Sequence, residues 1–274
     1  MKGKDVKECL RNGDRVYGTH IVSMGNPVEA RMKTALEMDF VFICTEHMPI
    51  DRTEVSMMCQ FYAANGISPI VRVPYPSAHW AGMLMDAGAD GIVAPYVETL
   101  EQVSELVGAV KYRPIKGKFL KDIISGKREP TPKLGEYLRK WNENNYLIIG
   151  IESVEAIENL EKLIDNDGVD GVFLGPHDIT CSMEIPEEFD NPKFIAAITD
   201  VIQRCRKLDK GVGFHGKLDN YIDTELNFVL NKADVAIMRE KLNGEFADIR
   251  HRKGDVYKGH DALAGVDEIK QCVK

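Results

Sequence analysis

Short apolar runs alternate along the chain with longer stretches in which apolar residues recur every three or four positions. Runs such as FVFIC (40–44) and GVFL (171–174) are apolar throughout, which is typical of parallel strands buried on both faces. The pattern predicts eight strands, at residues 16–22, 40–44, 69–73, 91–94, 146–151, 171–174, 211–214 and 234–237. It also predicts helices, at residues 27–38, 53–64, 78–87, 99–110, 154–164, 192–208 and 221–230, with a last helix from near Arg239.

This alternation indicates an α/β protein. Eight strand–helix units in about 250 residues favour a closed (β/α)8 TIM barrel over an open doubly wound sheet. Neither GxGxxG nor GxxxxGK[ST] occurs, so a nucleotide-binding loop has no support. We expect one barrel domain over residues 1–274, with an inserted basic loop at about 111–135 and a helical tail from about 239.

The inserted segment is unusual in its charge. Residues 111–140 carry ten basic and three acidic side chains, a local +7 in a chain whose formal net charge is −8. The segment lies between the fourth and fifth predicted strands, a position that suggests an active-site loop of the barrel. One interpretation is therefore a lid or a subunit-contacting element that attracts anionic substrates, and the alternative is a solvated surface loop.

Composition excludes several classes of protein. The chain is 44% apolar and 28% charged, and its 43 acidic against 35 basic side chains disfavour nucleic acid as a partner. No apolar run is long enough to span a bilayer, and the start MKGKDVKECL lacks the apolar core of a signal peptide. We expect a cytoplasmic protein with reduced thiols, because no CxxC motif links its six cysteines, Cys9, Cys44, Cys59, Cys181, Cys205 and Cys272.

Candidate chemistry gathers where the predicted strands end. The carboxyl ends of barrel strands meet at one mouth, and the polar residues there are Glu46 and His47, Arg72, Glu152, His177 and Asp178, and His215. Two carboxylates on adjacent strands favour a hard divalent ion such as Mg²⁺ or Mn²⁺. Each residue also has a structural interpretation, since Glu152 and Asp178 could cap helices, Arg72 could pair with a carboxylate and His47 could be a packed histidine.

Five segments resemble the HpcH/HpaI class II aldolases: TEHMPID (45–51), IVRVP (70–74), AGADGIVAPYVET (87–99), IIGIES (148–153) and DGVDGVFLGPHDIT (167–180). The resemblance extends in order and spacing over residues 14–240. It implies a barrel of the phosphoenolpyruvate/pyruvate superfamily that cleaves and forms 4-hydroxy-2-oxo acids by way of pyruvate enolate.

The resemblance also implies roles for individual residues. Glu152 and Asp178 would hold a divalent metal ion, Mg²⁺ or Mn²⁺, with Co²⁺ as a further candidate. Arg72 would stabilise the enolate oxygen, and His47 would exchange a proton with the C4 hydroxyl of the aldol. The substrate-binding group that it implies is Arg72, Pro176, His177 and Asp178.

Three positions depart from the family pattern. Cys44 replaces an acidic residue that orients the histidine, Gly150 replaces a glutamine that contacts the substrate, and GKFL at 117–120 replaces G-x-R-G. A neutral thiol accepts hydrogen bonds poorly, so either Glu46 or Asp51 orients His47 instead, or His47 is less well held. His215 is a further candidate for supporting the site. We infer a divergent subfamily with its own substrate.

The predicted function is a metal-dependent aldolase acting on a 4-hydroxy-2-oxo acid, with a 2-keto-3-deoxy sugar acid as one candidate. Its partners would be small-molecule 2-oxo acids and aldehydes. The alternatives are a citramalyl- or malyl-CoA-type lyase, an oxaloacetate decarboxylase, or a non-catalytic barrel that serves as a binding or scaffold subunit. Exchange of the last helix between subunits, as in the superfamily, implies a homo-oligomer, with a hexamer as the expected form.

Overall fold

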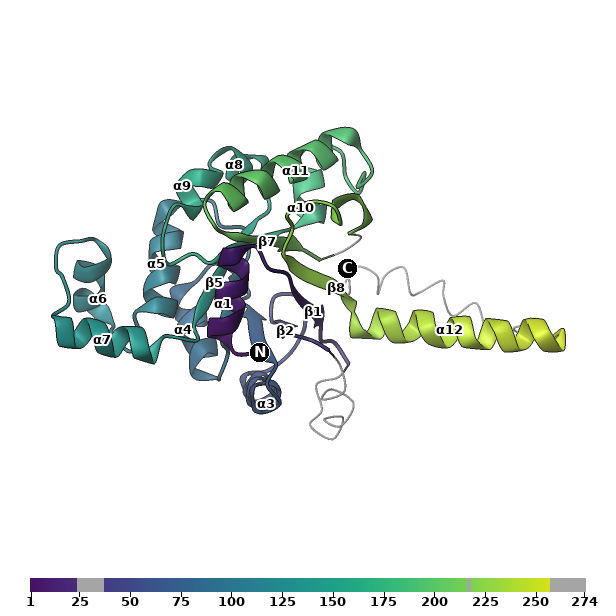
Figure 1. The fold of residues 1–274 in the computed structure, drawn as a ribbon, viewed down its shortest axis with the longest axis horizontal. Helices are drawn as coiled ribbons and strands as arrows, with labels where there is room; N and C mark the ends of the chain where they lie inside the picture. Colours follow the sequence, from purple (N-terminus) through teal and green to yellow (C-terminus); the bar gives the residue numbers. More distant parts are fainter. Residues whose placement is uncertain (24–36, 216–217, 257–274) are drawn as a thin grey trace.

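The computed structural model describes residues 1–23, 37–215 and 218–256. Eight strands form one sheet in the order β7-β6-β5-β4-β3-β2-β1-β8, and every adjacent pair is parallel (Figure 1). The strands are β1 (Val16–His20), β2 (Phe40–Cys44), β3 (Ser68–Arg72), β4 (Gly91–Ala94), β5 (Tyr146–Ile151), β6 (Gly171–Leu174), β7 (Gly211–Phe214) and β8 (Phe228–Ala233).

Helices follow the strands and begin at residues that cap them. The Asp51 side chain accepts hydrogen bonds from the N–H groups of Thr53 and Glu54, and Thr99 and Gln102 form a reciprocal capping box. The helices are α1 (Gly3–Asn12), α3 (Arg52–Ala64), α4 (Ala78–Asp86), α5 (Leu100–Lys111), α6 (Gly117–Ile124), α7 (Pro132–Trp141), α8 (Val154–Glu158), α9 (Leu160–Ile164), α10 (Pro176–Ser182), α11 (Pro192–Lys207), the 3₁₀ turn η2 (Asp219–Tyr221) and α12 (Asp234–Lys253).

The first and last edges of the sheet meet, which closes the barrel. His215 and Leu230 form an isolated parallel bridge between the ends of β7 and β8. Asn227 reinforces the junction, because its N–H donates to the Val212 carbonyl (3.0 Å) and its side-chain oxygen accepts from the Val212 N–H (2.9 Å). The predicted (β/α)8 barrel is therefore confirmed.

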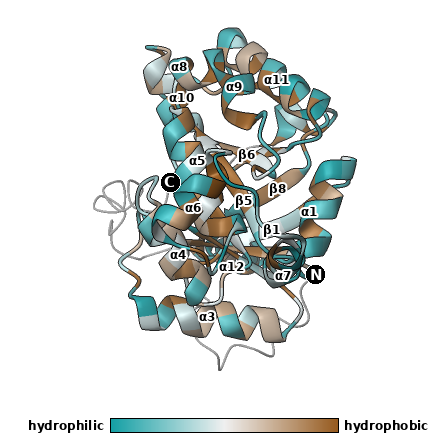
Figure 2. Ribbon diagram, turned by 90° about the vertical axis from the view of Figure 1, so that its left-hand side faces the viewer, coloured by the Kyte–Doolittle hydropathy of each residue, from teal (hydrophilic) through white to brown (hydrophobic). Residues whose placement is uncertain are grey.

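Two apolar layers hold the barrel together. Inside it, apolar side chains from different strands fill the lumen, as in the stacked pair Phe40 of β2 and Phe228 of β8, whose ring centroids are 4.4 Å apart. Outside it, the helices bury their apolar sides against the strands, so that in Figure 2 the central strands are the most hydrophobic elements and the helices are mixed. Successive side chains of each strand point alternately into the lumen and toward the helices, so strands that are apolar on both faces contribute to both layers.

Helix α1, which the sequence pattern did not predict, closes the amino-terminal end of the barrel. Val6 and Leu10 belong to the apolar cluster inside the lumen. The end of the helix is bonded to distant parts of the chain, because Arg206 Nη1 (2.7 Å) and Asn227 Nδ2 (2.9 Å) both donate to the Leu10 carbonyl. The barrel therefore has its floor at this end and its mouth at the other.

The inserted segment lies at the floor, so the lid interpretation is wrong. The segment follows helix α5 rather than a strand, and it contains the helices α6 and α7, which protrude from the barrel (Figure 1). Lys111 anchors its start, where Nζ donates to the Asn145 carbonyl (2.9 Å) and pairs with Asp170, just before β6. GKFL at 117–120 begins α6 and is therefore also remote from the mouth.

The predictions near the C-terminal end of the barrel are partly wrong. The eighth strand is 228–233, not 234–237, and the predicted helix at 221–230 is a 3₁₀ turn followed by that strand. A short apolar run such as VAIM (235–238) is compatible with a strand or a helix. Here it is helical, because α12 begins at Asp234, whose side chain accepts hydrogen bonds from the N–H groups of Val22 and Ser23. The predicted helix at 154–164 is divided into α8 and α9. The predicted helix at 27–38 lies outside the described residues, apart from 37 and 38.

Helix α12, predicted to begin near 239, begins at Asp234 and extends away from the barrel (Figure 1). Its exposed apolar side chains recur at helical spacing, and they are Ile237, Met238, Leu242, Phe246 and Ile249. In the part of the chain that the structure describes, no helix is both long enough and apolar enough to cross a membrane.

Candidate functional site

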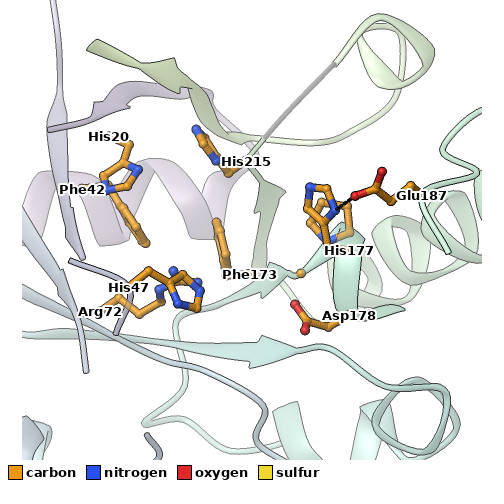
Figure 3. A pocket seen from close by; sticks show the side chains of 11 residues that line it. His20, Phe42, His47, Arg72, Phe173, His177, Asp178, Glu187 and His215 are labelled. Carbon is orange, nitrogen blue, oxygen red and sulfur yellow. Dashed lines mark ion pairs between the residues drawn. The ribbon is translucent and has the colours of Figure 1, made fainter. Parts of the chain in front are cut away.

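A cavity of about 420 Å³ occupies the mouth of the barrel (Figure 3). It brings together most of the residues that the sequence predicted there. The lining residues are His20, Phe42, His47, Arg72, Phe173, Gly175, Pro176, His177, Asp178, Glu187 and His215. Because they come from β1, β2, β3, β6 and β7 and the loops that follow, only the closed barrel places them together.

Asp178 lines this cavity, and Glu152 is buried next to it on the other side of Gly175. Glu152 directly follows β5 and is only 8% exposed. A Cβ atom at Gly175 would lie 2.9 Å from Glu152 Cγ and 3.2 Å from Asp178 Oδ2, so the two carboxylates flank the same glycine. Burial, together with the charges of Asp178 and Glu46, raises the pKa of Glu152 to about 7 even though Arg72 lowers it. The two carboxylates therefore repel each other, and a cation bound between them would stabilise their charged forms.

The donor set fits a hard divalent cation. Glu152 Oε1 is buried and has no hydrogen-bond partner among the residues that the structure describes, which leaves a carboxylate oxygen available as a ligand. Among the described residues, no group of three or more His, Cys, Asp and Glu side chains could hold a metal ion by itself. Two carboxylates leave the remaining coordination positions to water and to a chelating substrate, which is a common arrangement for Mg²⁺.

Arg72 projects from the end of β3 into the same cavity. Its Nη2 donates to Cys44 Sγ (3.1 Å), and its Nε lies 3.0 Å from Glu46 Oε2 without the alignment of a hydrogen bond. Burial would lower the pKa of Arg72, but Cys44 and Glu46 more than offset it, so the guanidinium stays charged. It is held as a fixed positive charge beside the two carboxylates.

The structure answers what could orient His47. Glu46 Oε2 lies 3.7 Å from His47 Nε2, whereas Asp51 caps helix α3 with its carboxylate. Cys44 is fully buried and accepts from the His47 backbone N–H (3.3 Å) rather than from the ring. Burial and the neighbouring Arg72 lower the pKa of His47, which favours the neutral imidazole. Of the two predicted candidates, only Glu46 is placed beside the ring.

The sequence did not predict two polar residues of the cavity, His20 and Glu187. His20 was read as the middle of a strand at 16–22, but β1 ends there, so its ring faces the mouth. It stands edge-to-face with His215 at 5.6 Å between centroids, and burial lowers the pKa of His20 to about 3 and that of His215 to about 4. Glu187 pairs with His177 Nδ1 at 3.6 Å.

Gly150 leaves no room for the glutamine that the family commonly has there. A Cβ atom at this position would lie 2.8 Å from Pro95 Cα and 2.9 Å from Glu152 Oε1, closer than side-chain carbons approach. Any larger residue would therefore displace the Pro95 backbone or the Glu152 carboxylate. The glycine is part of how this chain positions Glu152.

Comparisons with known proteins agree with this geometry. The family model described as HpcH/HpaI aldolase/citrate lyase matches residues 22–225. The chain is similar to the 2-keto-3-deoxy-L-rhamnonate aldolase of Salmonella gallinarum, with 27% identity over 245 residues, 88% of this chain and 91% of that one. It shares its fold with an HpcH/HpaI aldolase from Desulfitobacterium hafniense (TM-score 0.75, 24% identity, 89% and 96% covered) and with macrophomate synthase (0.71, 24%, 91% and 89%). The predicted enzyme class, an aldolase and so a carbon–carbon lyase, is confirmed, and the chain belongs to the HpcH/HpaI aldolase/citrate lyase family.

Proposed function

We propose that the chain is a metal-dependent aldolase that cleaves and forms a 4-hydroxy-2-oxo acid by way of pyruvate enolate. The observation that carries this proposal is that His47, Arg72 and Asp178 line one cavity at the barrel mouth. Glu152 is buried beside that cavity, against its lining residue Gly175. A 2-keto-3-deoxy sugar acid is the proposed substrate class, supported by the similarity to the rhamnonate aldolase.

Each residue has a role in this proposal. A divalent cation held by Glu152 and Asp178, with Mg²⁺, Mn²⁺ or Co²⁺ as candidates, would polarise the 2-oxo group when bound. Backbone N–H groups around His177 and Asp178, directly after Pro176, would bind the substrate carboxylate. His47 would take the C4 hydroxyl proton as the C3–C4 bond breaks and the aldehyde leaves, while Arg72 stabilises the enolate oxygen that develops.

Proton exchange at pyruvate C3 tests this function directly. In D₂O with Mn²⁺, we expect the wild-type enzyme to replace the methyl protons of pyruvate with deuterium, because enolisation needs no aldehyde. The measurement is loss of the methyl signal by NMR, compared with a sample lacking protein. A scaffold barrel would give no exchange, and a lyase of the CoA type would turn over citramalyl-CoA or malyl-CoA instead.

We also propose a homo-oligomer in which α12 packs against another subunit, and the hexamer stays a prediction. The apolar stripe on α12 and a cavity of about 600 Å³ beside β1 and β8 support it. Burying Leu242 and Phe246 would each contribute about 1.5–3 kcal/mol, so the double substitution Leu242→Glu and Phe246→Glu should lower the mass seen by light scattering. Asn243→Glu, which adds charge beside the stripe, is the control. A wild-type monomer at micromolar concentration would contradict the proposal.

The cytoplasm is the compartment that we propose. Five cysteines in the described residues carry free thiols: Cys9, Cys44, Cys59, Cys181 and Cys205. Free thiols are typical of a reducing compartment and support this proposal.

A further inference from the structure

A strained backbone conformation occurs close to Glu152. Tyr96, in the loop that follows β4, has a φ of 35°, in the left-handed region that bulky side chains rarely adopt. Its side chain is 40% exposed, and its hydroxyl makes one hydrogen bond of 3.3 Å to the Pro74 carbonyl, so packing of the ring does not account for the strain. Residues held in such conformations cluster at functional sites, where the surrounding structure imposes them.

The loop that carries Tyr96 is bonded to the end of β5. The Val97 N–H donates to the Gly150 carbonyl (2.9 Å). Just beyond the strand, the Ser153 hydroxyl donates to Glu98 Oε1 (2.6 Å). These two bonds fix the residues that follow Tyr96, so its left-handed backbone is imposed by the neighbouring strand rather than by its own preference.

Gly150 allows the loop to lie so close to β5. A Cβ atom at this position would lie 2.8 Å from Pro95 Cα and 3.0 Å from the Ala94 carbonyl oxygen, and both are backbone atoms that cannot rotate away. Gly150 is also one of the positions at which this chain departs from the family pattern. The glycine and the left-handed Tyr96 therefore belong to one arrangement, because the first provides room for the second.

This arrangement brings the Tyr96 backbone to the Glu152 carboxylate. Burial is the main cause that raises the pKa of Glu152 to about 7. A hydrogen bond from the Tyr96 N–H acts in the opposite direction, because it stabilises the charged carboxylate. Glu152 Oε1 has no partner within the described part of the chain, so that oxygen stays available to a cation.

We propose that Tyr96 is a positioning residue for Glu152: its left-handed backbone directs the N–H group at the carboxylate, and Gly150 provides the room for that approach. The backbone conformation is what this role requires, and the phenol ring is not. Partners that hydrogen-bond a metal ligand orient it, and their loss costs about 10–100-fold in metal affinity. The inference rests on the proposed function, in which Glu152 holds the cation.

Two substitutions at Tyr96 remove the same ring but differ in backbone preference. Asparagine adopts the left-handed region more readily than most residues, whereas β-branched valine is strongly disfavoured there. Tyr96→Val should therefore weaken Mn²⁺ binding by about 10–100-fold, while Tyr96→Asn should bind Mn²⁺ about as tightly as the wild type. Calorimetry or electron paramagnetic resonance gives this Kd without turnover. Tyr75→Val is the matched control, because Tyr75 is an exposed tyrosine in the loop after β3 whose φ lies outside the left-handed region.

Gly150→Ala tests the same arrangement from the side of β5. The added Cβ would displace the Pro95 backbone or the Glu152 carboxylate, so Mn²⁺ should again bind about 10–100-fold more weakly. Gly82→Ala in α4 is its control, since a Cβ atom there would meet none of the described residues within 4 Å. Wild-type affinity in Gly150→Ala would overturn the role of the glycine.

Equal Mn²⁺ affinities in Tyr96→Val and Tyr96→Asn would overturn the inference, whether both match the wild type or both are weak. If circular dichroism shows that Tyr96→Val does not fold, Tyr96→Ala replaces it, because alanine disfavours the left-handed region less than valine does. Wild-type affinity in Tyr96→Ala would then overturn the inference. Unchanged Mn²⁺ affinity in Glu152→Gln would instead refute the proposed function, since Glu152 would hold no cation.

Discussion

Glu152→Gln is expected to abolish proton exchange at pyruvate C3 and to weaken Mn²⁺ binding by more than about 100-fold. Glutamine keeps the size of the side chain but removes the charge that a hard cation requires. Loss of residues that only support a ligand already costs about 10–100-fold in metal affinity, and Glu152 would be a ligand itself. The raised pKa of Glu152 reflects repulsion from Asp178 and Glu46 as well as burial, which is the situation that cation binding relieves.

Mn²⁺ affinity measured by calorimetry or electron paramagnetic resonance gives a readout independent of turnover. Asp178→Asn should behave like Glu152→Gln, whereas Glu158→Gln, an exposed glutamate of α8, should match the wild type. If Glu152→Gln binds Mn²⁺ with wild-type affinity, the two carboxylates do not hold the metal. The role of the pair would then be electrostatic only.

His47→Ala is expected to slow aldol cleavage by about 10²–10⁴-fold, the usual contribution of a general base. Pyruvate binding should change little, since the proposed contacts of pyruvate are with Arg72, the cation and the backbone near Asp178. Steady-state cleavage rates and the pyruvate Kd separate these effects. Cleavage at the wild-type rate would show that His47 is structural.

Smaller changes around His47 test what holds the ring. Glu46→Gln should reduce cleavage less than His47→Ala, because Glu46 Oε2 lies 3.7 Å from Nε2 and acts through the histidine. Cys44→Ser should change little, while Cys44→Asp should raise cleavage if the strand end accepts a carboxylate beside Arg72. His79→Ala, an exposed histidine of α4, is the matched control.

Buried strands were the most predictable part of the fold. Five of the eight strands, including β2 and β5, have the predicted bounds. Phe40–Cys44 and Tyr146–Ile151 are apolar throughout, as expected of strands that are buried on both faces. The eighth strand was misplaced, because 228–233 includes the exposed Asn231 and Lys232 and lacks a continuous apolar run. Helix α1 was not predicted. Its apolar residues pack into the lumen of the barrel, and a contact of that kind cannot be inferred from local periodicity.

The site was predictable where its residues end strands. His47, Arg72, Glu152 and Asp178 follow apolar runs directly, so their meeting follows from barrel geometry alone. His20 was not predicted as a site residue, because the predicted strand ends at residue 22, two residues beyond the end of β1. The left-handed backbone at Tyr96 could not be predicted, since it depends on how the loop after β4 packs against β5.

The floor of the barrel has a consequence for folding kinetics. Leu10 is bonded to Arg206 and Asn227, partners that are separated from it by 196 and 217 positions in sequence. During synthesis helix α1 emerges long before either partner has been made, so its apolar face cannot be buried in the barrel until they are present. Closing so long a loop costs entropy before any contact repays it, which is characteristic of slowly folding, high-contact-order proteins. Helix α1 is thus translated before its partners but is among the last segments to reach its native contacts.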